Sequence, residues 1–136
     1  MVVPDAADVS KLRQGRIVGA WMRDTQGRNP KRRTGVIITP TDEISQTDPF
    51  VVAAITSTFK EPLAEDEIRL PWNRDPTKVR TGLTTPVVVK CSWLVALTAD
   101  DIEAVAGVVP DEVLRDILNR VSRLPGLANG TKDNAT

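Results

Sequence analysis

The sequence predicts a mainly β fold of the α+β class, in which a small antiparallel sheet curls into a barrel and one amphipathic helix follows it. β-Branched apolar runs between polar separators dominate the first two thirds of the chain. None of these separators is long enough to hold the helix of a parallel crossover. Helical periodicity appears only late, in residues 110–126. A chain of 136 residues can form one domain with a sizeable core.

Five short segments are predicted to be strands, since each is rich in Val, Ile or other apolar residues and is bounded by turn residues. They are residues 16–22, 35–40, 50–58, 67–72 and 86–97. The loop between the first two ends in Lys31, Arg32 and Arg33, directly before the apolar Val36 and Ile37. A charge run of this kind is ordinarily a solvated loop, but its position at the edge of a core also suits a ligand-binding role.

Two later segments are predicted to be helical. Residues 110–126 carry one apolar face, and Pro110 suits the first helical turn. The members of this face are Val113, Leu114, Ile117, Leu118, Val121 and Leu124. A shorter helix is expected over residues 99–107, ending at Gly107. We expect residues 1–13 to be an arm, residues 14–125 the barrel domain and residues 126–136 a mobile tail.

The composition limits the possible functions. Lysine plus arginine and aspartate plus glutamate number 18 each, so a uniformly basic nucleic-acid binder is excluded, whereas a local basic patch is not. The chain has no histidine, which removes histidine-based triads and most zinc or non-haem iron sites. Neither a P-loop nor a G-x-G-x-x-G pattern occurs. We therefore expect no metal and no cofactor.

Cysteine content and hydropathy indicate the compartment. The one cysteine, Cys91, cannot form an internal disulfide and is expected to pack as a small buried side chain. No apolar run approaches the roughly 18 residues of a membrane span, and the first residues do not resemble a signal peptide. These observations predict a cytoplasmic protein without membrane contact.

The order of the segments resembles the MazF/PemK family of toxin endoribonucleases. The resemblance covers roughly residues 14–124 and rests on "GRIVGAWM", "RRTGVIITP", "PFVVAAITST", "EIRLPW", "TGL", "PVVVKCSWLVAL" and the terminal helix. It implies a small SH3-like β-barrel of the MazF/CcdB type, a homodimer, and sequence-specific cleavage of single-stranded RNA without a metal. It also implies a cognate antitoxin with an acidic C-terminal tail.

The resemblance implies two catalytic residues. The arginine before the second strand falls on Arg33, and Arg32 would match only if the strand pattern shifted; the hydroxyl that ends the third strand falls on Thr56. A guanidinium can stabilise charge on phosphoryl oxygens, and a threonine hydroxyl can hydrogen-bond a ribose 2′-hydroxyl or a phosphate. The general base stays open between Asp24, Asp42 and water.

Further residues are expected to contact RNA. Basic side chains would hold phosphates, and one exposed aromatic ring would stack on a base. The expected residues are Arg28, Lys31, Arg32, Ser57, Trp72, Lys78 and Arg80. For all three tryptophans, Trp21, Trp72 and Trp93, a place in the core is also expected, because large aromatic side chains supply much core area, and Trp72 is the one to test against RNA.

The sequence departs from the family pattern at two places, which keeps other functions open. Thr34 stands where the family usually has proline, and "SWLV", residues 92–95, stands where many members have glutamine followed by isoleucine, arginine and threonine. A catalytically weak RNA-binding or regulatory module on the same barrel is therefore an alternative. A gyrase poison of the CcdB type is a further one, although that family carries a tryptophan near its C-terminus and residues 126–136 have none.

Overall fold

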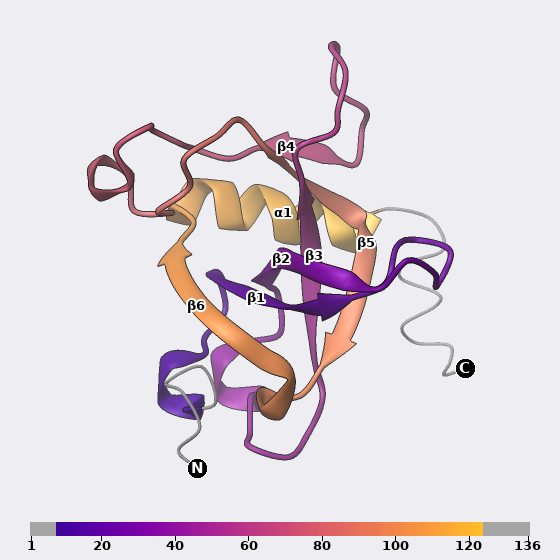
Figure 1. Ribbon diagram of the computed structural model, residues 1–136, viewed down its shortest axis with the longest axis vertical. Helices are drawn as coiled ribbons and strands as arrows, with labels where there is room; N and C mark the ends of the chain where they lie inside the picture. Colours follow the sequence, from indigo (N-terminus) through magenta and orange to yellow (C-terminus); the bar gives the residue numbers. More distant parts are fainter. Residues whose placement is uncertain (1–7, 124–136) are drawn as a thin grey trace.

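In this computed structural model, which describes residues 8–123, a curled sheet of six antiparallel strands packs against one α-helix (Figure 1). The strands are β1 (Arg16–Met22), β2 (Lys31–Ile37), β3 (Phe50–Thr56), β4 (Glu67–Arg69), β5 (Val88–Leu97) and β6 (Ile102–Val108), and the helix is α1 (Asp111–Arg123). Their order in the sheet is β4-β5-β3-β2-β1-β6. The predicted mainly β, antiparallel architecture with a C-terminal helix is confirmed, and the sheet stays open because β4 and β6 do not pair.

The curl brings β6 against the segment that follows β4. The backbone N–H of Gly107 donates to the carbonyl of Thr81 over 3.3 Å, and that of Val108 donates to the carbonyl of Arg80 over 3.0 Å. A Cβ atom at position 107 would lie 1.8 Å from the Arg80 carbonyl oxygen. Only glycine permits this approach, which ties the two ends of the open sheet together without a strand pair.

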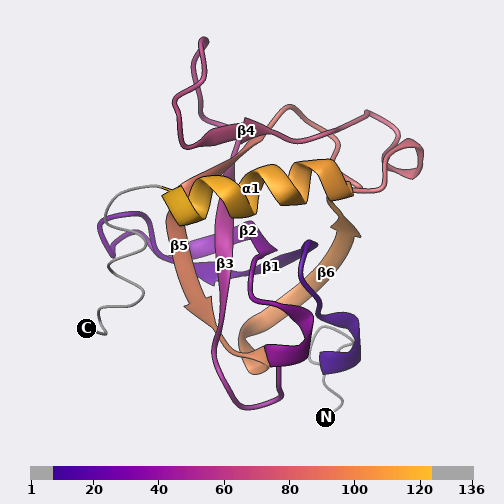
Figure 2. The ribbon, with the colours of Figure 1, turned by 180° about the vertical axis from the view of Figure 1, so that it is seen from behind.

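The sheet separates two hydrophobic clusters, because alternate residues of each strand point to opposite faces. The cluster beneath α1 includes Ile17, Val36 and Val89 with Ile117 of the helix. The cluster on the opposite face draws on β1, β2, β3, β5 and β6. Figure 2 shows α1 lying across the sheet. The helix prediction is confirmed for residues 111–123, whereas the last member of its predicted apolar face, Leu124, lies outside the described residues.

Several predicted boundaries need correction. The second strand begins at Lys31, not at residue 35, because β1 and β2 pair as a hairpin in which Met22 lies opposite Lys31. The fourth ends at Arg69, two residues before a proline that cannot donate to a ladder. The third and fifth, β3 and β5, keep most of their predicted ranges.

The short helix predicted over residues 99–107 is wrong. A 3-10 turn at Ala99–Asp101 leads directly into β6, which pairs with the free edge of β1. The segment holds three alanines and two aspartates, which are weak strand formers, so the tertiary pairing overrides local preference. Elsewhere in the described part of the chain, 3-10 turns occur at Val9–Lys11, Thr41–Glu43 and Pro76–Lys78. Among the described helices, none has the length and apolar character of a membrane span.

Candidate functional site

The beginning of β2 and the end of β3 border one pocket of about 400 Å³. Thr34 pairs with Ile55, so the antiparallel register, extended by one residue, places Arg33 opposite Thr56 on the same face of the sheet. The described residues that line the pocket are Lys31, Arg32, Arg33, Thr34, Ile55, Thr56, Ser57, Thr58, Thr85 and Val87. The structure therefore brings the two predicted catalytic residues together among cations and hydroxyl groups.

The Arg33 guanidinium is fixed by neutral partners. Its Nε donates to the carbonyl of Met22 over 3.0 Å, and its Nη2 donates to the carbonyl of Asn29 over 2.9 Å. Its Cζ lies 5.1 Å from the centroid of the Trp93 ring, which is within cation–π range. These two bonds use two of the five N–H groups of the guanidinium and leave three for an anion. Among residues 8–123, the side chain is held in place by groups that do not neutralise its charge.

Asp24 organises the β1–β2 loop, residues 23–30. Its Oδ1 accepts from the backbone N–H groups of Gln26 (2.9 Å) and Arg28 (2.8 Å), and its Oδ2 accepts from Asn29 Nδ2 (2.8 Å). These bonds, the one from the Arg28 backbone first, lower the pKa of the Asp24 carboxyl. Asn29 has a φ of 52°, a left-handed conformation that asparagine tolerates. The loop thus presents the Asn29 carbonyl that accepts from Arg33.

Neither carboxylate considered as a general base lines the pocket. Asp24 is engaged in holding the loop, and Asp42 lies in the 3-10 turn Thr41–Glu43. The described residues of the pocket wall include no carboxylate at all. The chemistry of this wall is therefore that of cations and hydroxyls.

Thr56 ends β3 with its hydroxyl in a defined position. Its Oγ1 accepts the backbone N–H of Thr58 over 3.0 Å, which leaves the hydroxyl hydrogen as a donor. The side chain is half-buried, whereas the neighbouring Ser57 is exposed. Both line the pocket. The end of this strand can therefore donate hydrogen bonds to a ligand placed beside Arg33.

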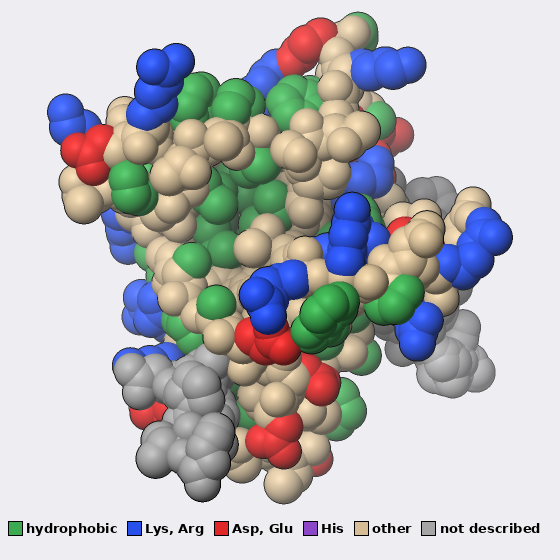
Figure 3. Space-filling model, viewed as in Figure 1, with side chains coloured by type: hydrophobic (Ala, Val, Ile, Leu, Met, Phe, Trp, Pro, Cys, Tyr) green, Lys and Arg blue, Asp and Glu red, His purple; other side chains and the backbone are tan. Residues whose placement is uncertain are grey.

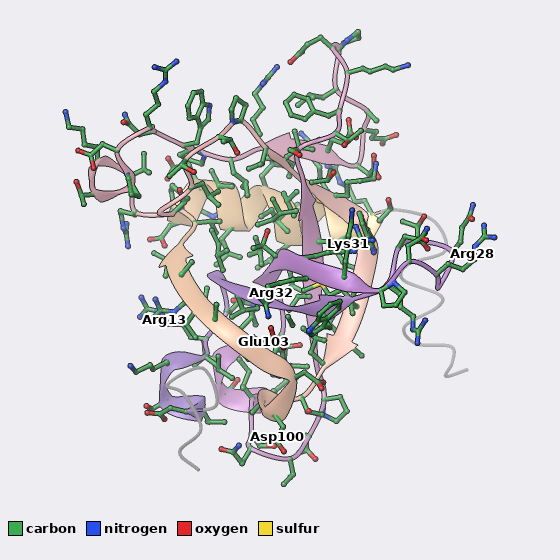
Figure 4. The ribbon with its side chains drawn as sticks, viewed as in Figure 1. Arg13, Arg28, Lys31, Arg32, Asp100 and Glu103 are labelled. Carbon is green, nitrogen blue, oxygen red and sulfur yellow. The ribbon has the colours of Figure 1, made fainter. Side chains whose placement is uncertain are left out.

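The remaining cations of the basic run differ in their surroundings. Arg32 reaches Glu103 of β6, with 2.7 Å between Nη2 and Oε1, and Figure 4 shows the two side chains pointing toward one another. Lys31 is exposed and lines the pocket. Arg28 lies out on the β1–β2 loop in Figure 4 and does not line it. Figure 3 shows Lys and Arg side chains on this face over β2 and the loop.

Three predicted RNA-contacting residues lie elsewhere. Trp72, Lys78 and Arg80 belong to the segment between β4 and β5, and all three are exposed. None lines the pocket of Arg33 and Thr56. Trp72 leaves 40% of its surface exposed, which is compatible with stacking on a base. The structure does not bring these residues into the pocket.

The expectation that Trp21, Trp72 and Trp93 lie in the core is wrong. Trp21 is 55% exposed and lies near the end of β1, one residue beyond the last residue that pairs with β6. Trp93 is half-buried against Arg33 and also lines a second pocket of about 580 Å³ between the end of β1 and β5. Trp93 is the site residue that sequence reasoning missed. The signal for it was the departure from the family pattern in "KCSWLVAL".

Comparisons with known proteins agree on one family. A sequence profile of PemK-like, MazF-like toxins of type II toxin–antitoxin systems matches residues 13–124. No similar sequence was found among curated proteins. A solved MazE–MazF structure from Deinococcus radiodurans superimposes with a TM-score of 0.59 at 21% identity, over 85% of this chain and 95% of that one.

Two mycobacterial structures are also similar. An endoribonuclease in complex with its cognate antitoxin, from a mycobacterial species, gives a TM-score of 0.61 at 14% identity and covers 82% of this chain and 91% of that one. The toxin MazF-mt6 of Mycobacterium tuberculosis gives 0.56 at 18% identity, over 79% of this chain and 92% of that one. At these identities the structural likeness supports the fold.

Proposed function

Because the chain belongs to the family of PemK-like, MazF-like toxins of type II toxin–antitoxin systems, we propose that it cuts single-stranded RNA at specific sequences without a metal ion. The observation that carries this proposal is the placement of Arg33 and Thr56 in one pocket, where no carboxylate among the described residues pairs with the guanidinium. Such a group is prepared for a phosphate. An RNA substrate would make the cytoplasm the site of action.

The proposed reaction uses the RNA itself as nucleophile. The ribose 2′-oxygen attacks the adjacent phosphorus, the bond from phosphorus to the 5′-oxygen breaks, and a 2′,3′-cyclic phosphate and a 5′-hydroxyl result. The free N–H groups of Arg33 stabilise charge on the non-bridging oxygens, which grows in the transition state. Thr56 positions the 2′-hydroxyl or a phosphate oxygen by its hydroxyl hydrogen.

The pocket assists proton transfer less than it assists charge stabilisation. Arginine stays protonated and cannot act as a base. Since no described residue of the pocket wall carries a carboxylate, we assign the proton of the 2′-hydroxyl to water. The leaving 5′-oxygen takes its proton from solvent, while Arg33 stays protonated and stabilises the charge. A modest turnover rate is the consequence.

RNA binding is proposed to follow the cations around this pocket. Lys31 and Arg32 line it, and Arg28 lies beyond it on the β1–β2 loop. Arg32 shares its charge with Glu103, so we expect its contribution to be smaller than that of Lys31. Ser57 adds a hydroxyl at the pocket wall. Trp72, Lys78 and Arg80 would contact more distant nucleotides from their separate segment.

We further propose a homodimer and an antitoxin partner. One barrel leaves part of the apolar face of α1 uncovered, since Leu114 and Leu118 are half-buried and line a surface pocket of about 260 Å³. The Deinococcus relative was solved as MazE–MazF, and one mycobacterial relative was solved in complex with its cognate antitoxin. An acidic, initially disordered tail would compete with RNA for the cations near Arg33.

A second candidate function is RNA binding with little or no cleavage. The described residues of the pocket wall carry no carboxylate, which favours this function, because none of them accelerates deprotonation of the 2′-hydroxyl. Such a module would keep the affinity that Lys31 and Arg33 provide. It would not produce new RNA ends.

The test is incubation of the purified protein with a long single-stranded RNA in EDTA, followed by mapping of the ends. We expect discrete cuts that leave cyclic phosphate and 5′-hydroxyl ends. Bound but intact RNA would favour the binding module. Cuts that appear only after a divalent metal ion is added would contradict the proposed mechanism.

A further inference from the structure

We propose that Trp93 is a positioning residue, which holds the Arg33 guanidinium and the β1–β2 loop (residues 23–30) as one unit. This inference rests on the proposed function, because the guanidinium is positioned for a phosphate. Trp93 lies on β5 and Arg33 on β2, with β3 between these two strands. Nothing in the family pattern assigns a role to a tryptophan at this position.

The pairing of β5 with β3 is irregular at Trp93. Ala53 of β3 pairs with Leu94, but Ile55 pairs with Val89, so residues 90–93 of β5 lie in a register shift. Strict alternation along a strand does not hold across such a shift. The position of the Trp93 side chain is therefore given by its own contacts with Arg33 and with the Arg23 carbonyl.

Trp93 makes two contacts with different partners. Its ring centroid lies 5.1 Å from Arg33 Cζ. Its indole Nε1 donates to the carbonyl of Arg23 over 3.3 Å, at the first residue of the loop. Arg33 in turn donates to the carbonyls of Met22 and Asn29, one residue before that loop and near its end. The two side chains therefore fasten both ends of the loop.

An aromatic face suits this task for an electrostatic reason. A long arginine side chain must lose rotamer freedom before it can grip a phosphate, unless the protein has already ordered it. A carboxylate would order it but would also cancel its charge. The ring quadrupole attracts the cation and leaves its N–H edge available. Trp93 thus prepares Arg33 for the reaction without competing with the substrate.

The expected consequence falls on the chemical step. An arginine that is released from its orientation still attracts RNA by its charge, but it stabilises the transition state less well. We expect Trp93→Leu to lower kcat about tenfold while KM changes by less than about threefold. A merely structural role would instead reduce the amount of folded enzyme and leave kcat per folded molecule unchanged.

Two substitutions separate the two contacts of Trp93. Trp93→Phe keeps an aromatic face and loses the indole N–H, whereas Trp93→Gln keeps a donor for the Arg23 carbonyl and loses the ring. If the ring positions Arg33, Phe retains most of the parental kcat and Gln behaves as Leu does. Trp21→Leu is the matched control, since Trp21 lines the same 580 Å³ pocket and is 55% exposed. Should Leu prevent folding, the Phe and Gln pair carries the test.

A second readout does not depend on RNA cleavage. The Arg33 Nε–H proton should show a ring-current shift in NMR spectra, assigned by its loss in Arg33→Lys. The shift should disappear in Trp93→Gln, persist largely in Trp93→Phe and be unchanged in Trp21→Leu. An unchanged Arg33 resonance in Trp93→Gln, or parental kcat in that variant, would overturn the inference. A parent protein that does not cut RNA would refute the proposed function, whereas this shift would still decide whether Trp93 holds Arg33.

Discussion

Two regions of the sheet hold their charged side chains in opposite ways. Around β4, the neighbouring part of β5 and α1, carboxylates neutralise the cations. Lys90 Nζ lies 3.1 Å from an oxygen of Glu67 and 3.5 Å from one of Asp66, and Arg120 lies 3.1 Å from Asp116. The pKa of the Glu67 carboxyl is lowered, first by the backbone N–H of Ala64 and then by Lys90.

At the other region, around the pocket of Arg33 and Thr56, the partners are neutral. Arg33 is held by two backbone carbonyls and an aromatic ring. A carboxylate partner would satisfy the guanidinium and remove its attraction for a further anion, whereas carbonyls and rings only orient it. The comparison teaches that the type of partner, not the presence of a cation, separates a structural arginine from one prepared for a ligand.

The difference between the two regions can be removed by placing a carboxylate in the pocket of Arg33 and Thr56. Ser57 is exposed on the pocket wall, so Ser57→Glu places an acid near Arg33 without disturbing the core. Like-charge repulsion against phosphate costs several kcal/mol, so we expect about a 100- to 1,000-fold loss of kcat/KM on RNA. Ser57→Gln is the control of equal size. Equal losses in both variants would show that size rather than charge is responsible.

The reactivity of the Cys91 thiol measures how well the hydrophobic cluster beneath α1 excludes solvent. The thiol is fully buried, and burial raises its pKa to about 11. Since the thiolate is the reactive form, a disulfide reagent at pH 8 should react about 100-fold more slowly with the folded protein than with the denatured protein. Rapid labelling under native conditions would show that this cluster opens readily.

Lys90→Met removes the cation that neutralises Glu67 and Asp66. The carboxylate of Glu67 is largely buried, so it would be left without its charged partner, and we expect the free energy of unfolding to fall by roughly 1–3 kcal/mol. Urea unfolding at neutral pH measures this loss. Lys60→Met, at an exposed position, is the control and should change stability little. A stable Lys90→Met variant would show that the ion pairs between β4 and β5 are dispensable.

The smallest expected effect concerns an exposed cation at the pocket. Lys31→Ala should weaken RNA binding a few-fold at physiological salt and reduce the slope of log affinity against log salt by about one. Arg13 is also exposed but lies away from Lys31 in Figure 4, so Arg13→Ala should leave the slope unchanged. Identical slopes for both variants would place the RNA elsewhere.

Much of the fold was predictable from local patterns. The β-branched runs of β1, β3 and β5 and the apolar face of α1 are signals that local sequence carries. β6 was missed because four of its seven residues, two alanines, one glutamate and one glycine, are weak strand formers, and the strand depends on pairing with the free edge of β1. The early start of β2 was missed because three consecutive cations, Lys31 to Arg33, are typical of a solvated loop. Only the hairpin register with β1 shows that they belong to a strand.

The candidate site was predictable only in part. The resemblance selected Arg33 and Thr56, and the register between β2 and β3 explains their meeting at one pocket. The role of Trp93 depends on its contact with Arg33, which lies two strands away in the sheet. No local sequence pattern encodes such a contact. The separation of Trp72 from the pocket likewise depends on where the β4–β5 segment runs.

The most direct test of the central claim compares single-turnover cleavage of RNA in EDTA by the parent, Arg33→Ala and Arg13→Ala. Loss of one charge-stabilising donor typically lowers the rate about 100- to 1,000-fold, and we expect this loss for Arg33→Ala with the chain still folded. Thr56→Ala should also abolish cutting, whereas Arg13→Ala should cut as the parent does. Cleavage by Arg33→Ala at the parental rate would contradict the assignment of this pocket as the active site.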